Sequence, residues 1–149
     1  SLFNDLSVIE NLNGISELSK QPNVMTVDEI IHTFNLKKII NKKGRELSGG
    51  QRRKTEIART LIGNPKLLLL DEPFSGIDPI AVDEIKDLLS HIKTMGISIL
   101  ITYHNVRETL KICDKSYLMA DGSIFLAGTK DEIVSNSLAK EKYLGSSFE

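Results

Sequence analysis

One short apolar run constrains the fold of this chain more than any other feature. Residues 66–73 read KLLLLDEP: four leucines, preceded by the turn-forming pair Asn64-Pro65 and followed directly by two carboxylates. A continuous apolar run of this length between structure-breaking residues is typical of a strand buried on both faces, the usual case in a parallel sheet. The sequence therefore predicts a strand here, with both of its faces covered.

A helix and a second strand follow the leucine run. Asp78-Pro79 has the form of an N-cap and a first helical residue, and an apolar stripe then continues until Gly96 supplies a stop signal. The run ISILIT, residues 97–102, has the composition of a second buried strand. A strand, a helix and a strand in this order predict two parallel strands joined by a right-handed crossover.

Helix signals flank this unit on both sides. Ser7 to Glu10 and Thr26 to Glu29 have the capping-box spacing, in which a hydroxyl and a carboxylate each bind a free amide at a helix start. Ser48 stands near the start of a third helix, whose apolar stripe continues to a stop signal at Gly63. Further signals are a short helix from about Asn105, a hairpin turning at Asp121-Gly122, and a capping box from Thr129 to Glu132 that opens terminal helices.

Composition limits the classes of function. The 149 residues, 40% of them hydrophobic, are enough for one folded domain or two small ones. Nineteen basic and twenty acidic residues leave a net charge of -1, so charge does not favour a nucleic-acid partner. The single Cys113 predicts a packed thiol in a reducing compartment. No apolar run approaches the roughly 20 residues that span a bilayer, so we expect a cytosolic chain that docks on a membrane partner.

Three side chains beyond the strand ends are the first candidates for chemistry. Ligands of open α/β sheets bind beyond the carboxyl ends of the strands, where Asp71 and Glu72 follow one strand and His104 follows the next. Asp71 is suited to hold Mg²⁺, usually through a water, and Glu72 to polarise a water that attacks a γ-phosphate. Taken singly, an Asp-Glu pair after a strand is often a turn, and a lone histidine is usually structural.

Four motifs in order resemble the ATP-binding subunit of ABC transporters. Leu47 to Gln51 (LSGGQ) matches the signature motif, and Leu67 to Glu72 matches the Walker B strand with its catalytic glutamate. Ser75 to Asp78 (SGID) stands in place of the D-loop, and His104 in place of the switch histidine. The resemblance implies an α/β fold: a partial P-loop NTPase core with parallel strands, a helical signature subdomain, and a C-terminal hairpin with helices.

The resemblance also implies a site shared between two subunits. Two subunits of this family sandwich two ATP molecules, each held by the phosphate loop of one chain and the signature motif of the other. A helix N-terminus offers unpaired amides and a partial positive charge, and glycines let the backbone approach phosphate oxygens closely; an ordinary helix cap is the alternative for these residues. The implied roles are catalytic for Glu72 and His104, nucleotide-binding for Ser48, Gly49, Gly50, Gln51, Ser75 and Asp78, and Mg²⁺-binding for Asp71.

A finer resemblance concerns the second half of the chain. Residues 104–133 and Tyr143 to Phe148 resemble the ATPase of lipopolysaccharide-export transporters, whose cargo is a lipid. ATPases for branched-chain amino-acid uptake share much of this pattern and remain an alternative. The implied partners are a second ATPase subunit and transmembrane permease subunits, with no nucleic acid. The implied location is cytoplasmic, at the inner face of the inner membrane.

Two family motifs are missing from this sequence. None of the ten glycines is followed by lysine, so the phosphate loop G-x-x-x-x-G-K-[ST] is absent, and the glutamine loop is absent too. The resemblance therefore covers the C-terminal part of such an ATPase, with residues 1–63 as helical subdomain and 64–149 as the second half of the nucleotide-binding core. We expect ATP hydrolysis by the full-length protein and none by this chain alone. A non-hydrolysing interaction module and a soluble ABC ATPase of DNA repair or translation are competing hypotheses.

Three residues beside the motifs need their own interpretation. Tyr103 precedes the switch histidine, where the export subfamily is expected to carry a small or acidic residue. Its ring either rests on neighbouring chain or changes a polar contact near the γ-phosphate. Arg52 and Arg53, directly after the signature motif, are interpreted as a solvated helix face.

Overall fold

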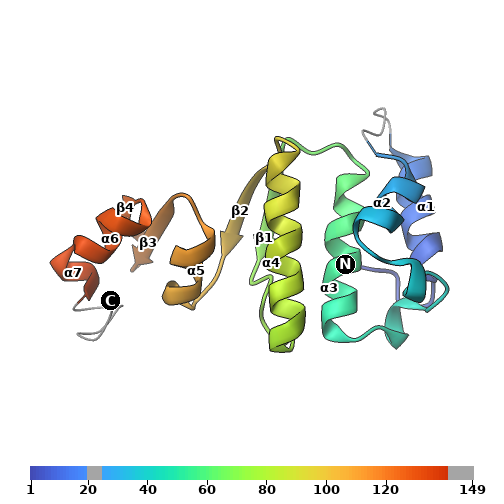
Figure 1. Cartoon of the computed structure of the whole chain (residues 1–149), viewed down its shortest axis with the longest axis horizontal. Coiled ribbons are helices and arrows are strands. Elements are labelled where there is room, and N and C mark those ends of the chain that lie inside the picture. Colours follow the sequence, from blue (N-terminus) through green and yellow to red (C-terminus); the bar gives the residue numbers. More distant parts are fainter. Residues whose placement is uncertain (20–24, 141–149) are drawn as a thin grey trace. The chain divides into compact units, whose positions relative to one another are not determined.

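The structure, a computed structural model, describes residues 1–19 and 25–140, which belong to two compact units (Figure 1). The segment Tyr143 to Phe148 therefore lies outside the described residues. The first unit, Ser1–Thr102, contains α1 (Val8–Leu18), α2 (Val27–Thr33), the 3-10 helices η1 (Lys37–Ile39) and η2 (Gly44–Glu46), α3 (Gly49–Leu61), β1 (Leu67–Asp71), α4 (Pro79–Thr94) and β2 (Ser98–Thr102). The second unit, Tyr103–Glu149, contains α5 (Val106–Ile112), β3 (Ser116–Ala120), β4 (Ser123–Gly128), α6 (Lys130–Ser135) and α7 (Ser137–Ala139).

Local capping interactions start the helices where the sequence predicts. At α1 the Ser7 hydroxyl accepts from the amide of Glu10, whose carboxylate accepts from the Ser7 amide at 2.7 Å. Each such contact spans three residues, so sequence spacing is enough to predict it. The boxes from Thr26 to Glu29 and Thr129 to Glu132, and the caps Ser48, Asp78 and Asn105, are confirmed in the same way.

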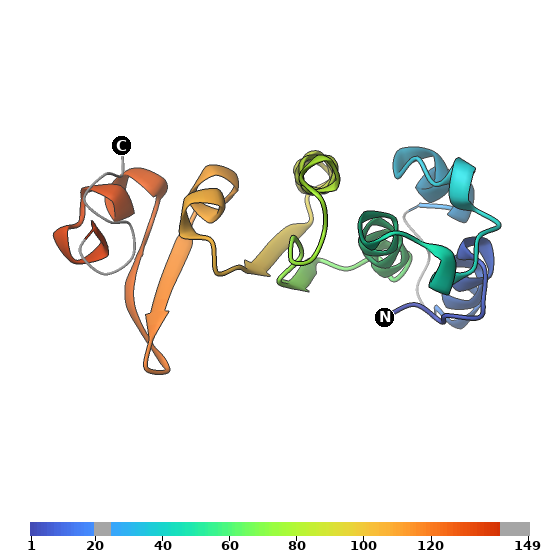
Figure 2. The ribbon, with the colours of Figure 1, turned by 90° about the horizontal axis from the view of Figure 1, so that it is seen from below.

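The strands β1 and β2 pair in parallel, as predicted, from Leu67 opposite Ser98 to Asp71 opposite Thr102. Helix α4 covers one face of this pair (Figure 2), where Leu68 and Leu70 are buried. On the opposite face Leu67 and Leu69 are 52% and 65% exposed. The prediction that both faces are covered is therefore wrong for the first unit, because its described part supplies one covering helix.

Helix α3 lies side by side with α4 and contacts α1 on its other side (Figure 1). The helix ends where the sequence predicts, but the left-handed residue that follows is Asn64, at φ 50°, rather than Gly63. Asparagine tolerates this conformation because its short polar side chain can bond locally. The core between the helices is formed by Val8, Leu12, Ile30, Phe34, Leu36, Ile57, Ala58, Ile62, Ile85 and Ile92.

The second unit is built on the predicted hairpin. Strands β3 and β4 pair antiparallel, and Asp121 and Gly122 turn the chain with φ 48° and 74°. Two successive left-handed residues suit a tight hairpin, which explains the Asp-Gly pair. The side chain of Cys113 is half-buried. The core of this unit is Leu110, Leu118, Ile133 and Ala139.

Candidate functional site

The predicted metal and catalytic residues, Asp71 and Glu72, lie at the paired ends of β1 and β2, and both contact Thr102. The Thr102 hydroxyl donates to Oδ1 of Asp71 and accepts from the Glu72 amide at 3.1 Å. The Thr102 carbonyl also lies 3.1 Å from that amide. Thr102 therefore contacts both residues that the sequence places in the site, a role that sequence reasoning missed.

Glu72 has a constrained backbone. Its φ of 46° lies in the left-handed region of backbone conformation. Residues other than glycine seldom adopt this region, and doing so strains the backbone. Its carbonyl accepts from the amide of Ser75 at 3.1 Å and from Nη2 of Arg53 at 3.3 Å. Its carboxylate accepts from the Ser75 hydroxyl at 2.6 Å. Glu72 is thus held through its amide, its carbonyl and its side chain.

The LSGGQ segment contains the start of α3, where Ser48 and Gly49 are exposed and Gly50 is buried. The Ser48 hydroxyl accepts from the Gln51 amide at 3.3 Å, and Gln51 Oε1 accepts from the Ser48 amide at 3.2 Å. The ordinary helix cap considered for Ser48 is therefore present. A hydroxyl that accepts one bond keeps its own hydrogen to donate, so capping leaves Ser48 able to bind an anionic oxygen.

Close packing joins this helix start to the Ser75–Asp78 loop. A Cβ on Gly50 would lie 2.4 Å from the Cβ of Ala81, and one on Gly49 would lie 3.2 Å from Cγ2 of Ile77. The loop itself is fixed because Asp78 caps α4, accepting from the Ala81 amide at 3.0 Å. The two glycines therefore permit the close approach of α3 to α4. Within the first unit the predicted signature glycines thus pack against the predicted D-loop and the start of α4, and Ser75 of that loop contacts Glu72.

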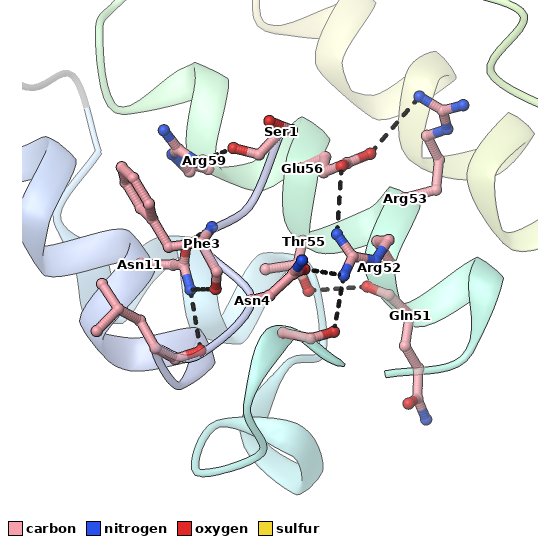
Figure 3. Close-up of polar contacts among 12 residues, drawn as sticks. Ser1, Phe3, Asn4, Asn11, Gln51, Arg52, Arg53, Thr55, Glu56 and Arg59 are labelled. Atoms are coloured by element: carbon pink, nitrogen blue, oxygen red, sulfur yellow. Dashed lines mark hydrogen bonds and ion pairs between the residues drawn. The ribbon is translucent and has the colours of Figure 1, made fainter. Parts of the chain in front are cut away.

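Arg52 and Arg53 are not a solvated face, so that interpretation is wrong (Figure 3). Arg52 donates to Oδ1 of Asn4 and, at 3.1 Å, to the carbonyl of Gly44. Arg53 donates to the carbonyl of Glu72, and both arginines pair with Glu56. Only 32% and 28% of their side chains is exposed. Their long side chains reach elements that helical periodicity cannot identify.

A buried asparagine organises the start of the chain, as the labelled contacts in Figure 3 show. Asn11 is 1% exposed and accepts from the amide of Phe3 at 2.8 Å. Its Nδ2 donates to the carbonyls of Phe3, Leu6 and Ser7. Sequence reasoning missed this residue. The usable signal was a polar Asn11 placed among apolar helix positions such as Val8 and Leu12, which the structure shows to be fully buried.

The predicted switch histidine belongs to the second unit. His104 is exposed, and the centroid of the Tyr103 ring lies 5.1 Å from its imidazole at a tilt of 58°. The Tyr103 ring therefore contacts the imidazole of the next residue, and the choice between its two interpretations stays a prediction. The convergence of His104 with the carboxylates of the first unit stays a prediction.

The chemistry of Asp71 fits Mg²⁺ bound together with a phosphate ligand. Within the described ranges 1–19 and 25–140, no group of three or more His, Cys, Asp or Glu side chains could hold a metal ion. Mg²⁺ commonly uses only one or two carboxylates and completes its shell with waters and substrate phosphates. Asp71 is exposed at a strand end and offers oxygen ligands of this kind.

No helix in the described part of the chain combines the length and the hydropathy needed to cross a bilayer.

Comparisons with known proteins agree on one family. The family model described as ABC transporter matches residues 1–75. The lipopolysaccharide export system ATP-binding protein LptB of Haemophilus influenzae is 43% identical over 152 residues, covering 99% of this chain and 63% of the relative. LptB of Escherichia coli K12 is 41% identical with the same coverage. The chain thus spans less than two thirds of the length of these relatives.

Solved structures confirm the fold. A nucleotide-free ATP-binding cassette from an ABC transporter superposes with a TM-score of 0.79 at 28% identity, over 95% of this chain and 64% of that chain. The protein cbiO1 of Clostridium perfringens, part of an ABC transporter complex, superposes with a TM-score of 0.77 at 30% identity, over 95% and 58%. The motif order, the packing of α3 against the Ser75–Asp78 loop and these matches agree: the chain belongs to the ATP-binding proteins of ABC transporters.

Proposed function

We propose that this chain is part of an ATP-hydrolysing subunit that powers lipid export, with lipopolysaccharide as the cargo. The relatives named as lipopolysaccharide-export proteins match 99% of the chain, and this breadth supports the export assignment. In this proposal residues 1–63 form the helical subdomain and residues 64–149 the second half of the nucleotide-binding core. The subunit pairs with a second copy and docks on permease subunits at the cytoplasmic face of the inner membrane.

The hydrogen bonds around Glu72 are the observation that carries the proposed chemistry. Thr102, Ser75 and Arg53 hold this residue at the end of β1, next to Asp71. A carboxylate fixed at a strand end can orient and polarise the water that attacks the γ-phosphate. Mg²⁺, when bound through Asp71 and the phosphates, neutralises charge on the transferred group.

The remaining predicted residues act around the same phosphates. The Ser48 hydroxyl and the amides of Gly49 and Gly50 at the start of α3 donate to phosphate oxygens of the partner subunit's nucleotide. Gln51 supports this helix start through its reciprocal bonds with Ser48. Ser75 positions Glu72, while Asp78 holds the D-loop through its cap of α4. His104 is the proposed switch residue that senses the γ-phosphate.

Steady-state hydrolysis by the full-length protein with its membrane subunits tests the proposal. We expect Glu72→Gln to retain ATP binding, to slow turnover by about 10²-fold, and to accumulate the ATP-bound dimer. Glu17→Gln, on the exposed part of α1, is the control and should hydrolyse like the wild type. Undiminished hydrolysis by Glu72→Gln would remove this residue from the catalytic role.

The cargo requires a second measurement. In proteoliposomes, lipopolysaccharide should stimulate hydrolysis and should leave the membrane in an ATP-dependent manner. Stimulation by a branched-chain amino acid with its binding protein would instead support an uptake ATPase. A wild type that binds ATP and never hydrolyses it would support the non-hydrolysing interaction module.

A further inference from the structure

The Thr102 hydroxyl makes two bonds of opposite direction. It donates its hydrogen to Oδ1 of Asp71 and accepts the amide hydrogen of Glu72 at 3.1 Å. A hydroxyl has a single hydrogen to donate. Once that hydrogen points to Asp71, only the lone pairs of the oxygen remain to accept the Glu72 amide. One side-chain atom therefore connects the carboxylate of one site residue to the backbone of the next.

The location of Thr102 makes this connection rigid. Thr102 is the last residue of β2 and the register partner of Asp71, so the strand ladder sets its backbone position. A β-branched residue has restricted rotation about χ1, which keeps its hydroxyl in place.

The constraint acts where the backbone needs it. Glu72 has a φ of 46°, a left-handed conformation that is unfavourable for a residue with a Cβ. Its amide lies 3.1 Å from both the carbonyl and the hydroxyl oxygen of Thr102, a bifurcated arrangement. Without the hydroxyl, the Glu72 amide keeps one acceptor, the Thr102 carbonyl. The Asp71 carboxylate loses its hydrogen bond from Thr102.

We propose that Thr102 is a positioning residue, whose hydroxyl orients the Asp71 carboxylate toward Mg²⁺ and the Glu72 backbone toward the attacking water. The inference rests on the proposed ATPase function. In this role Thr102 acts through its bonds to Asp71 and Glu72.

Two matched variants separate this role from a structural one. Thr102→Val keeps the β-branched shape and strand propensity but removes the hydroxyl, whereas Thr102→Ser keeps the hydroxyl and loses the methyl group. A contribution from strand packing alone ranks valine above serine, because β-branched side chains suit strands. Positioning by the hydroxyl gives the opposite order, with serine close to threonine and valine impaired.

The experiment uses the full-length protein with its membrane subunits. We expect Thr102→Val to lower kcat by about tenfold or more, because the variant loses a hydrogen bond to the charged carboxylate of Asp71. Its half-maximal Mg²⁺ concentration should rise several-fold. Calorimetric titration provides a readout other than activity: ATP affinity in EDTA should match the wild type, and the gain in affinity on adding Mg²⁺ should shrink. Thr102→Ser should stay within about threefold of the wild type in kcat and in its Mg²⁺ response.

Each outcome decides the matter. A Thr102→Val variant that matches an active wild type in kcat and in Mg²⁺ response would overturn the positioning role and leave the proposed function intact. A Thr102→Ser variant whose kcat falls as much as that of Thr102→Val would also overturn the positioning role, and would support a role in strand packing. A wild type that neither hydrolyses ATP nor responds to Mg²⁺ would overturn the proposed function, and this inference with it.

Discussion

The guanidinium of Arg53 donates a hydrogen bond of 3.3 Å to the backbone carbonyl of Glu72. Arg53 stands on α3, the helix that begins directly after Ser48, while Glu72 follows β1. The Arg53 side chain thus connects two proposed functional elements. One is α3, whose start we propose to bind the partner's nucleotide, and the other is Glu72, which we propose to act on the chain's own nucleotide. A shift of α3 would therefore change a contact that holds Glu72, the residue to which we assign catalysis.

This contact predicts a kinetic defect without loss of the fold. Arg53→Ala in the full-length protein should lower kcat by about fivefold, because a neutral acceptor bond is worth about 1 kcal/mol. Arg53→Lys should recover part of the loss, since lysine keeps a donor. Arg45→Ala is the control, because Arg45 pairs with Asp5 at an exposed position. Steady-state kinetics decide the matter, and equal rates for Arg53→Ala and the wild type would contradict the assigned link.

The packing of Gly50 predicts a stability effect that the signature motif alone does not explain. Gly50→Ala should destabilise the protein by about 1–3 kcal/mol, because its Cβ would lie 2.4 Å from that of Ala81. Ala81→Gly in the same chain should restore part of the loss. Gly14→Ala is the matched control: nothing lies within 4 Å of its new Cβ, and alanine favours a helix interior. Thermal unfolding measures all three, and an unchanged Gly50→Ala variant would show that α3 and α4 separate without cost.

Ser48 predicts a defect that depends on the partner subunit. Ser48→Arg places a bulky cation at the exposed start of α3, where the partner's γ-phosphate is proposed to bind. Monomeric ATP affinity of the full-length protein should stay near the wild-type value while hydrolysis collapses. Ser90→Arg, on the exposed part of α4, is the control. Loss of ATP affinity in the monomer together with normal turnover in the dimer would contradict the assignment.

The capping box of α1 predicts a pH dependence of stability. Hydrogen bonds from the Ser7 hydroxyl and then from the Ser7 amide hold the pKa of Glu10 below its ordinary value of 4.5. A carboxylate with a lowered pKa in the folded state contributes stability above its unfolded pKa, and the contribution is lost as pH falls through the folded value. The thermal midpoints of wild type and Glu10→Gln should therefore differ most above pH 4.5 and converge below it. Glu17→Gln on the same helix is the control. A difference in thermal midpoint between wild type and Glu10→Gln that persists unchanged at pH 2 would rule out the Glu10 carboxylate as its cause.

The 149-residue chain alone is expected to bind nucleotide poorly. Phosphate affinity in this family is attributed mainly to the phosphate loop, and none of the ten glycines here is followed by lysine. Calorimetry with Mg-ATP should detect no saturable binding at micromolar concentration, and no hydrolysis should be measurable. Light scattering should detect self-association through the exposed Leu67, Leu69 and Leu100. Tight stoichiometric binding by a clean monomer would contradict both expectations.

Local features of this protein could be predicted from sequence because their contacts span few residues. The box from Ser7 to Glu10, the cap at Ser48 and the turn at Asp121-Gly122 all form within four consecutive residues. Their residue types limit the backbone directly, through a hydroxyl that binds an amide three residues on or through a glycine with positive φ. The motif order likewise placed Asp71 and Glu72 at a strand end.

Only the tertiary structure decided the contacts that hold the site together. Thr102 lies 31 residues from Asp71, and Arg53 lies 19 residues from Glu72. Neither spacing follows a helical or strand period, so no pattern could have predicted these bonds. The strand register determines the first contact: a slip of one residue between β1 and β2 would remove Thr102 from Asp71 and turn its hydroxyl to the other face. Sequence determined which groups lie near the strand ends, and the pairing of the strands determined which of them touch.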